Sequence, residues 1–222
     1  MVVTEEWASS TRLAKSSEMK VGIVNAGLGN VASIRRMLER VGAIGVYVSS
    51  QKELMEIDAL VLPGVGNFGE GMRALRNADL IETLKTLVYV DNVPILGICL
   101  GMQLLCRNSE EGSDPGLGLI EAEVKKFRSS ADERLKVPHM GWNEVRPVSY
   151  NPLIPLTDEE QRFYFVHSYR VVPDDPSIVI GTANYGGEFC AAFQKDNIFG
   201  VQFHPEKSHR FGMALMKRFV EI

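Results

Sequence analysis

The stretch Val93-Pro-Ile-Leu-Gly-Ile-Cys-Leu-Gly-Met-Gln103 decides how this chain folds and what it can do. Its apolar first half predicts a buried strand over residues 95–98, and a helix is expected to follow at once. Gly97 and Gly101 stand two residues before and after Cys99. Small residues there permit a sharp strand-to-helix turn that holds the central side chain in a strained conformation at the mouth of a sheet. The stretch therefore has the form of a nucleophile elbow.

The sequence before this elbow alternates between β-rich runs and helical periodicity. Strands are expected at 21–25, 45–48 and 59–62, and helices at 30–41, 71–78 and 81–90. Asn30 is the expected N-cap of the first helix. This alternation predicts an α/β fold with an open, mostly parallel central sheet and helices on both of its faces.

The C-terminal half changes character, because short β-rich runs there are joined by turns. Strands are expected at 119–127, 143–148, 162–166, 178–183, 189–194 and 199–203, with a closing helix from about residue 208. These runs predict additional antiparallel strands in the C-terminal half.

One domain is expected over residues 19–222. Residues 1–18 are polar and lack the apolar core of a secretory signal, so we interpret them as a mobile N-terminal extension.

Composition narrows the possible functions. The 222 residues carry a formal net charge of −4 with acidic and basic residues interspersed, so nucleic acid is not an expected partner. No apolar run approaches the roughly 18 residues that span a membrane. The three cysteines form no CxxC pair and no histidines cluster with them, which predicts no metal site and a reducing cytoplasm as the location.

Cys99 is the candidate nucleophile, although a lone cysteine in an apolar run is also the usual form of an inert core residue. Its position favours reactivity, since the N-terminal end of a helix stabilises a thiolate. Cys106 and Cys190 lack such a setting and are interpreted as structural. His204 and Glu206 stand two residues apart, so the carboxylate can hold the imidazole in the tautomer that takes a thiol proton. By itself, a histidine such as His204 is more often a structural or surface residue than a catalytic one.

A glycine-rich loop, Leu62-Pro-Gly-Val-Gly-Asn-Phe-Gly69, follows the strand expected at 59–62. Open α/β folds bind ligands at this edge of the sheet, and backbone N–H groups of such a loop can face an oxyanion. An ordinary turn between strand and helix is the alternative. The turn Asn25-Ala-Gly-Leu-Gly-Asn30 lacks the third glycine and the acidic residue of a dinucleotide site, so no cofactor is expected.

Together these motifs resemble the class I glutamine amidotransferases, whose flavodoxin-like α/β sheet carries a Cys-His-Glu triad. Gly97-Ile-Cys-Leu-Gly-Met-Gln103 is similar to the elbow of that class, and Gln202-Phe-His-Pro-Glu206 to its His/Glu segment. Within the class, residues 63–66, 136–143, 164–169 and 203–208 resemble the glutaminase subunits of imidazole glycerol phosphate synthase, an enzyme of histidine biosynthesis. The first turn departs from that subfamily, which commonly has Asp-Tyr where this chain has Asn25-Ala26.

The resemblance implies glutamine hydrolysis through a γ-glutamyl thioester on Cys99. His204 is then the general base and acid, and Glu206 orients it. The backbone N–H groups of Leu100 and Val65 are the implied oxyanion donors, with allowance for a rearrangement of the Val65 peptide. The residues implied to bind the substrate glutamine are Gly66, Gln103, Glu111 and Ser168.

The implied partner is a (β/α)8-barrel cyclase subunit that forms a heterodimer with the glutaminase. It receives ammonia through an internal channel and makes imidazole glycerol phosphate and aminoimidazole carboxamide ribotide. Weak glutaminase activity without the loaded partner is a further implication. The residues expected at the interface are Asn30, Trp142, Asn143 and Lys207.

Two kinds of alternative remain. The triad is common to the glutaminase components of other synthases, for example those of CTP, GMP or pyridoxal phosphate. A catalytically silent regulatory subunit or a cysteine peptidase could use the same fold or the same dyad, because a fold does not fix a function. The intact triad argues against a silent subunit, and the absence of an extended peptide-binding signature argues against a peptidase.

Overall fold

The computed structural model describes residues 18–128 and 135–222. The extension expected over residues 1–18 therefore lies outside the described residues except for Glu18. The strands are β1 (Lys20–Val24), β2 (Ile44–Val48), β3 (Ala59–Gly64), β4 (Ile95–Cys99), β5 (Asn108–Ser109), β6 (Ala122–Lys126), β7 (His139–Pro147), β8 (Gln161–His167), β9 (Tyr169–Pro173), β10 (Val179–Asn184), β11 (Glu188–Lys195) and β12 (Ile198–Val201). The helices are α1 (Val31–Arg40), α2 (Gln51–Leu54), α3 (Phe68–Asn77), α4 (Ile81–Tyr89), α5 (Leu100–Leu104) and α6 (His209–Val220), with 3-10 turns η1 (Pro176–Ile178) and η2 (Pro205–Lys207).

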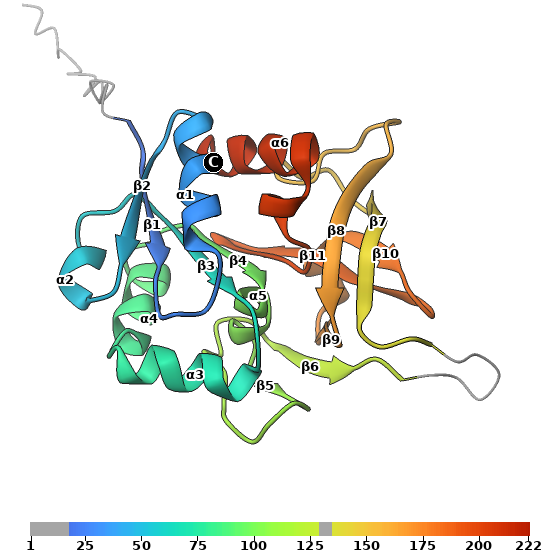
Figure 1. The fold of residues 1–222 in the computed structure, drawn as a ribbon, viewed down its shortest axis with the longest axis horizontal. Helices are drawn as coiled ribbons and strands as arrows, with labels where there is room; N and C mark the ends of the chain where they lie inside the picture. The colour runs from blue at the N-terminus through green and yellow to red at the C-terminus, as the bar shows by residue number, and fades with distance from the viewer. Residues whose placement is uncertain (1–17, 129–134) are drawn as a thin grey trace, which may run out of the picture.

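The large sheet has the strand order β2-β1-β3-β4-β12-β11-β10-β7-β8 (Figure 1). Its first five strands are parallel and follow the 2-1-3-4-5 order of flavodoxin-like sheets. β3 and β4 are buried along their whole length, as unbroken apolar strands at the centre of a parallel sheet should be. Their C-terminal ends meet at one edge, where Gly64 pairs with Cys99.

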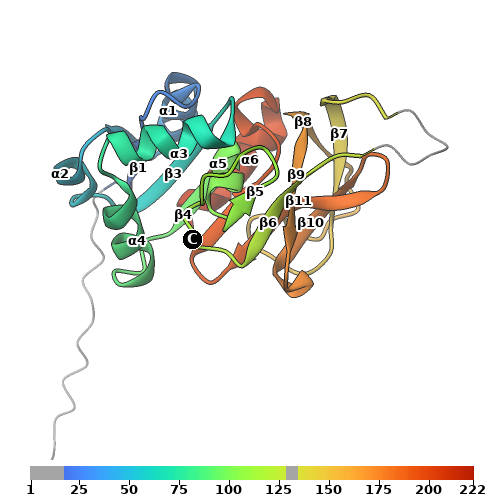
Figure 2. The ribbon, with the colours of Figure 1, turned by 90° about the horizontal axis from the view of Figure 1, so that it is seen from below.

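The remaining four strands of the large sheet continue it in antiparallel fashion beyond β12. A second sheet of order β5-β6-β9 lies alongside them, with β9 in contact with β11 (Figure 2). The antiparallel half thus builds a wall on one side of the edge at which β3 and β4 end.

The large sheet separates two hydrophobic cores. α1 and α6 cover one face and contribute buried side chains such as Leu38 and Phe219. α3, α4 and α5 cover the other face with side chains such as Phe68 and Leu84. Figure 1 shows the parallel strands between these two groups of helices. No helix in the described parts of the chain is long and apolar enough to cross a membrane.

The predicted fold class is confirmed, whereas several boundaries were wrong. α3 begins at Phe68 and not at residue 71, because the side chain of Asn67 caps it by accepting from the Glu70 N–H at 3.2 Å. β7 begins at His139 and not at residue 143, because residues 139–142 already pair with β8.

The short helix α2 and the strand β9 were not predicted. Only Ser168 separates β8 from β9, so the chain passes from one sheet to the other without the turn residues that would indicate a break.

The start of α5 lies directly against the backbone of β3. A Cβ atom at Gly101 would overlap the carbonyl group of Leu62, and one at Gly97 would lie 2.7 Å from the Cα atom of Met102. The missing side chains at these two positions allow the helix to leave β4 as sharply as it does.

Gly101→Ala is expected to lower the free energy of unfolding by about 3 kcal/mol or more, because the added methyl group meets backbone that has no room to move. Gly112→Ala is the matched control, since a Cβ at that exposed glycine meets nothing within 4 Å, and a change within about 0.5 kcal/mol is expected. Urea unfolding measures both variants. Equal stability of the two would contradict the close approach of α5 to β3.

Candidate active site

Cys99 occupies the junction between β4 and α5 with φ 54° and ψ −110°, a left-handed backbone that a residue with a side chain rarely adopts. The nucleophile elbow predicted from the flanking glycines is therefore present. The side chain is only 6 % exposed and lies at the N-terminal end of α5. Strain of this kind persists only where the surrounding structure enforces it, and it is concentrated at functional sites.

His204 and Glu206 lie across from Cys99, on the segment that leaves β12 and enters η2. Nδ1 of His204 and Oε1 of Glu206 are 2.7 Å apart, and both side chains are almost fully buried. Ser208 holds this segment in place, since its hydroxyl donates to the His204 carbonyl at 2.6 Å and accepts from the Tyr164 N–H at 3.0 Å. β12 is the neighbour of β4 in the sheet, so residues a hundred positions apart meet at one edge.

The charge state of His204 depends on its two neighbours. Burial favours the neutral imidazole, but interactions with the sulfur of Cys99 and the carboxylate of Glu206 outweigh this effect and raise the pKa of His204 to about 10. Nε2 of the ring is buried and has no hydrogen-bond partner among the described residues. Because Glu206 engages the other nitrogen, Nε2 is the atom left for proton exchange with a group in the pocket.

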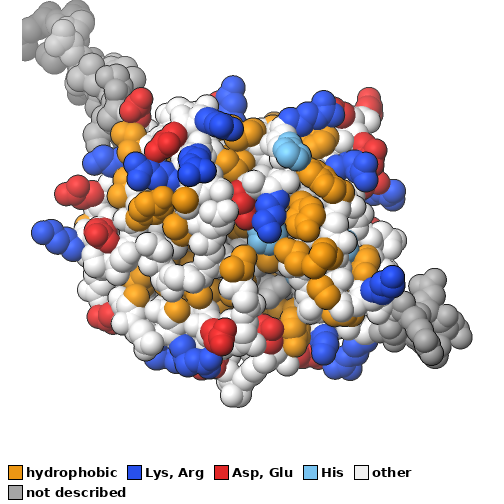
Figure 3. All heavy atoms as spheres, in the orientation of Figure 1, with side chains coloured by type: hydrophobic (Ala, Val, Ile, Leu, Met, Phe, Trp, Pro, Cys, Tyr) orange, Lys and Arg blue, Asp and Glu red, His pale blue; other side chains and the backbone are white. Residues whose placement is uncertain are grey.

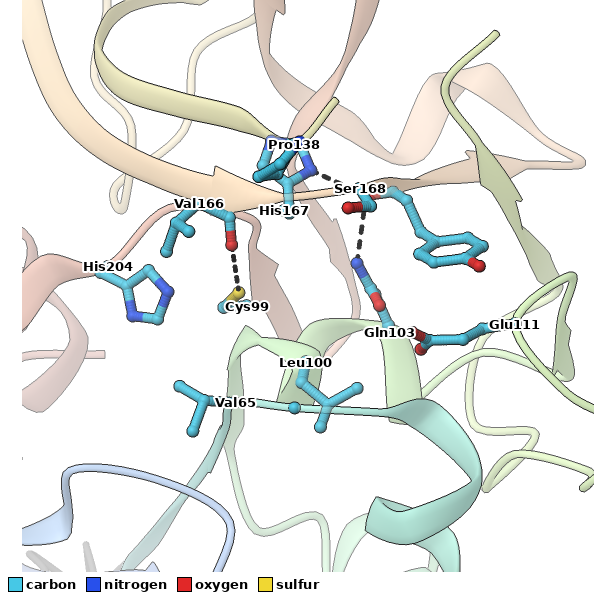
Figure 4. Close-up of a pocket in the computed structure, with 12 residues that line it drawn as sticks. Val65, Cys99, Leu100, Gln103, Glu111, Pro138, Val166, His167, Ser168 and His204 are labelled. Atoms are coloured by element: carbon cyan, nitrogen blue, oxygen red, sulfur yellow. Dashed lines mark hydrogen bonds between the residues drawn. The ribbon is translucent and has the colours of Figure 1, made fainter. Parts of the chain in front are cut away.

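A pocket of about 300 Å³ opens beside Cys99. Figure 4 shows the sulfur between His204 on one side and Gln103 on the other, with Glu111 farther along the same wall. The pocket is lined by Val65, Gly66, Cys99, Leu100, Gln103, Glu111, Pro138, Val166, His167, Ser168, Tyr169 and His204. All four residues expected to bind substrate therefore lie on its wall.

Some polar groups of the pocket already form hydrogen bonds with other residues of the chain. Nε2 of Gln103 donates to the Tyr169 carbonyl at 3.2 Å and to Oε1 of Gln202 at 3.0 Å, which leaves its own carbonyl oxygen as an acceptor. Oε2 of Glu111 accepts from the Phe68 N–H at 2.7 Å, at the start of α3. A carboxylate held in this way can attract the ammonium group of an amino acid through its other oxygen.

The two expected oxyanion donors differ in their orientation. Leu100 is the first residue of α5, so its N–H belongs to the amides that a helix leaves without an intrahelical partner. The N–H of Val65 instead donates to the Leu28 carbonyl at 2.5 Å. Val65 lines the pocket, but in this conformation its peptide is turned away from an oxyanion next to Cys99.

Sequence reasoning gave no role to a buried chain of polar groups behind the pocket. The Tyr169 carbonyl can only accept, so Nδ1 of His167 carries the proton of the 2.7 Å contact between them. Nε2 of His167 must then accept from Nδ1 of His139 at 3.0 Å, and Nε2 of His139 from the Asn143 amide at 3.2 Å. Burial lowers the pKa of His139 to about 4 and that of His167 to about 3, which keeps both rings neutral at pH 7.

These histidines were visible in the sequence, but nothing in their spacing indicated that they pair. His139 and His167 are 28 positions apart and meet only because β7 and β8 are neighbours with these two residues in register. Val166, Pro138 and Tyr169 also line the pocket and had no predicted role.

Three of the four residues expected at a partner interface are exposed, and two of them, Trp142 and Lys207, lie close together. Trp142 is 42 % exposed and its ring stacks on that of His209 with centroids 5.5 Å apart. Nζ of Lys207 lies 5.5 Å from the centre of the Tyr164 ring, which Trp142 also contacts edge-on. Asn30 is exposed at the start of α1, where its side chain accepts from the Ser33 N–H.

Asn143 differs from these three because its side chain is engaged inside the chain. Its amide nitrogen donates to Asn184 and contacts His139, and its oxygen accepts from the Glu144 N–H at 2.8 Å. The structure thus gives Asn143 an internal function in addition to any contact with a partner.

Exposed apolar side chains occur on the pocket wall, at Val65, and on and just before β7. Val65, Val137, Met140 and Trp142 are each more than a third exposed. Figure 3 shows hydrophobic side chains gathered near the centre of this face, with many of the charged groups toward its edges. Exposed apolar side chains that are grouped in this way are typical of surfaces that bind another protein.

The other two cysteines have the character of core residues. Cys106 and Cys190 are buried and form no disulfide, and burial raises the pKa of both thiols, that of Cys190 to about 12. Within residues 18–128 and 135–222, no group of three or more metal-binding side chains is found.

Comparison with known sequences agrees with this geometry. Residues 22–222 match the family model described as glutamine amidotransferase class-I. The imidazole glycerol phosphate synthase subunit HisH 2 of Pseudomonas aeruginosa is 47% identical over 90% of this chain and 98% of its own length. The subunits named HisH 2 from Methanococcus maripaludis and HisH from Bdellovibrio bacteriovorus are 45% and 43% identical, over 98% and 100% of their lengths.

Solved structures agree in fold at much lower identity. The structure of PurLQS from Thermotoga maritima superposes with a TM-score of 0.70 at 19% identity, covering 92% of this chain and 99% of that one. The crystal structure of a glutamine amidotransferase from Thermotoga maritima gives a TM-score of 0.61 at 18% identity, covering 92% and 82%. Over almost its whole described length, the chain therefore belongs to the class I glutamine amidotransferases and, within them, to the HisH subunits of imidazole glycerol phosphate synthase.

Proposed function

We propose that this chain hydrolyses glutamine at Cys99 and passes the ammonia to a (β/α)8-barrel cyclase subunit. The observation that carries the proposal is the strained Cys99 facing a buried His204–Glu206 pair across a pocket of about 300 Å³. A thiol, a base and a group that orients the base are the parts that acyl transfer to a thiol requires.

In the reactive state the thiol proton has already passed to Nε2 of His204, whose raised pKa keeps it there at pH 7. The Cys99 thiolate attacks the side-chain carboxamide of glutamine, and the imidazolium gives its proton to the departing ammonia. Water then breaks the γ-glutamyl thioester with His204 as base, and glutamate leaves. Glu206 keeps the proton of Nδ1 in place throughout, because its carboxylate lies 2.7 Å from that nitrogen.

Glutamine lies along the wall formed by Gln103, Glu111 and Ser168. The Glu111 carboxylate and the carbonyl oxygen of Gln103 accept from the α-ammonium group, and Ser168 meets the α-carboxylate. The carboxamide end then reaches the sulfur, since Cys99 and Gln103 line the same pocket.

The resting chain is a weak glutaminase, because one of the two oxyanion donors is occupied. The N–H of Val65 donates to Leu28 at 2.5 Å, so its peptide has to turn before it can meet the tetrahedral oxyanion. Val65 is half exposed, next to the surface on which a partner would dock, so a partner can act on it directly.

The cyclase docks on the surface that contains Asn30, Trp142 and Lys207. An exposed Trp stacked on a histidine, beside a lysine, has the composition of an interface anchor. We place this heterodimer in the reducing cytoplasm, which suits three unpaired thiols. Residues 19–222 form the catalytic domain, with residues 1–18 as an extension.

Glutaminase activity is expected to rise strongly when the cyclase and its nucleotide substrate are added, and to fall at least about 1000-fold in Cys99→Ala, which lacks the nucleophile. Ammonia release from glutamine measures both. Cys106→Ala is the matched control, because that buried thiol is outside the pocket and its loss should leave turnover nearly unchanged. Insensitivity to this cyclase would assign the chain to another synthase, and no turnover with any synthase would favour a silent subunit.

The rate of the complex is expected to fall as pH rises through about 10, where the His204 imidazolium loses the proton that it gives to ammonia. Glu206→Gln removes a carboxylate that raises the pKa of His204, so the alkaline fall should move to lower pH. Initial rates between pH 7 and 10.5 test this, with circular dichroism to establish that the proteins stay folded. An alkaline limb at the same pH in both proteins would contradict the assignment of Glu206.

Trp142→Ala is expected to weaken binding of the cyclase by about 30-fold, because an exposed aromatic anchor at an interface is worth on the order of 2 kcal/mol. Tyr150→Ala removes another exposed aromatic side chain, beyond the end of β7, and should leave the affinity unchanged. Isothermal titration calorimetry compares the two variants with the unaltered chain. Equal affinities for all three would place the interface elsewhere.

A further inference from the structure

The side chain of Gln202 lies beside the reacting sulfur, although it belongs neither to the triad nor to the wall of the pocket. Gln202 follows β12 directly and is completely buried. Its Nε2 atom is 3.7 Å from Sγ of Cys99, within the range of an N–H donor to sulfur. Its Oε1 atom accepts from Gln103. A glutamine without any exposed surface must have its amide satisfied by the protein.

The orientation of the two amides follows from one backbone group. The Tyr169 carbonyl can only accept a hydrogen bond. The side-chain atom of Gln103 that lies 3.2 Å from it must therefore be the amide nitrogen. That same nitrogen is 3.0 Å from Gln202, which must therefore present its oxygen. The nitrogen of Gln202 is then directed at Cys99. A reversal of either amide would set two donors or two acceptors against each other.

The Tyr169 carbonyl is itself fixed by the histidine chain behind the pocket. Nδ1 of His167 donates to it at 2.7 Å, and His139 fixes the tautomer of His167 from the other side. A continuous series of hydrogen bonds thus runs from the paired histidines through Gln103 and Gln202 to the sulfur.

Gln202 and Val166 act on the sulfur in opposite senses. The Val166 carbonyl, 3.9 Å from Sγ, can accept from a thiol but repels a thiolate. The Gln202 N–H donates to either form and bonds more strongly to the charged one, because hydrogen bonds to charged groups are about twice as strong. Among the described residues, Sγ is the only acceptor that Nε2 of Gln202 has. The buried amide therefore gains most when the sulfur is ionised.

We propose that Gln202 is a catalytic residue that donates a hydrogen bond to the Cys99 thiolate, and that Gln103 is the positioning residue that orients it. The inference rests on the proposed glutaminase function for its role in turnover, but not for the contact itself. Gln202 transfers no proton, since the thiol proton goes to His204. The N–H of Gln202 stabilises the thiolate before it attacks glutamine. It does so again when the thioester is hydrolysed and the sulfur leaves as a thiolate.

The test is the pH dependence of alkylation of Cys99 by iodoacetamide in the isolated chain. Gln202→Met keeps the length of the side chain but removes the donor. The midpoint of the curve of alkylation rate against pH is expected to move up by about one unit, with about tenfold slower alkylation at pH values below it. Gln202→Glu should shift the midpoint further, because a carboxylate beside the sulfur repels the thiolate.

Two controls isolate the contact. Cys99→Ala should take up no label, since Cys106 and Cys190 are buried thiols whose pKa is raised. Gln161→Met removes another buried glutamine, whose amide donates to the Pro155 carbonyl at 3.1 Å, away from the pocket. It should lower stability without moving the alkylation midpoint.

Turnover with the cyclase provides a second readout. Because Gln202 does not line the pocket, Gln202→Met should lower kcat about tenfold and leave KM for glutamine within about twofold. An unchanged alkylation midpoint in a folded Gln202→Met variant would overturn the proposal, and so would a rise in KM alone.

Alkylation needs neither glutamine nor a partner, so its outcome is independent of the proposed function. A shifted midpoint in a chain that shows no glutaminase activity would retain the contact and refute the function. If circular dichroism shows that Gln202→Met does not fold, the same alkylation measurement on Gln103→Met tests the proposal. This variant keeps Gln202 but removes the Gln103 amide that donates to it and orients it. A smaller upward shift would support the proposal, and no shift would overturn it.

Discussion

The close approach of α5 to β3 is the constraint on which the rest of this site depends. Hydrogen atoms at Gly97 and Gly101 take the place of side chains that would meet backbone atoms of neighbouring segments. Only with this approach can the chain turn from strand to helix within one residue, and that residue, Cys99, takes up the strain as a φ of 54°. The sulfur is thereby fixed at the mouth of the sheet and at the start of a helix by the local backbone alone, without any contribution from His204 or Glu206.

The other components reach the sulfur because of strand order. β12 pairs with β4 in parallel register, which brings Gln202, His204 and Glu206 to the edge where Cys99 lies. The antiparallel strands beyond β12 supply the opposite wall, since β8 ends at His167 and β9 begins at Tyr169. One mixed sheet therefore provides the nucleophile from its parallel half and much of the surrounding pocket from its antiparallel half.

Local signals explain why so much could be predicted from sequence. The elbow glycines, the continuous apolar strands and the His-Pro-Glu segment each act over a few residues, and they indicated the fold class and the positions of Cys99, His204 and Glu206. The Gln103–Gln202 contact and the His139–His167 pair join residues far apart in the chain, and their amide orientations and tautomers depend on a backbone carbonyl. Spacing carries no information about such contacts. The occupied N–H of Val65 is likewise a property of one conformation and not of a motif.

The state of this site limits what a partner has to contribute. The hydrogen bond from Nδ1 of His204 to Glu206 is already formed and the histidine is buried beside the sulfur, so the proposed acid–base groups need no assembly. Of the two proposed oxyanion donors, the N–H of Val65 is bound to the Leu28 carbonyl. If the function is as proposed, turning that peptide brings in an oxyanion donor that is worth roughly 3 kcal/mol in the transition state, or about a hundredfold in rate. Activation then requires a small displacement of one loop and no rearrangement of the triad.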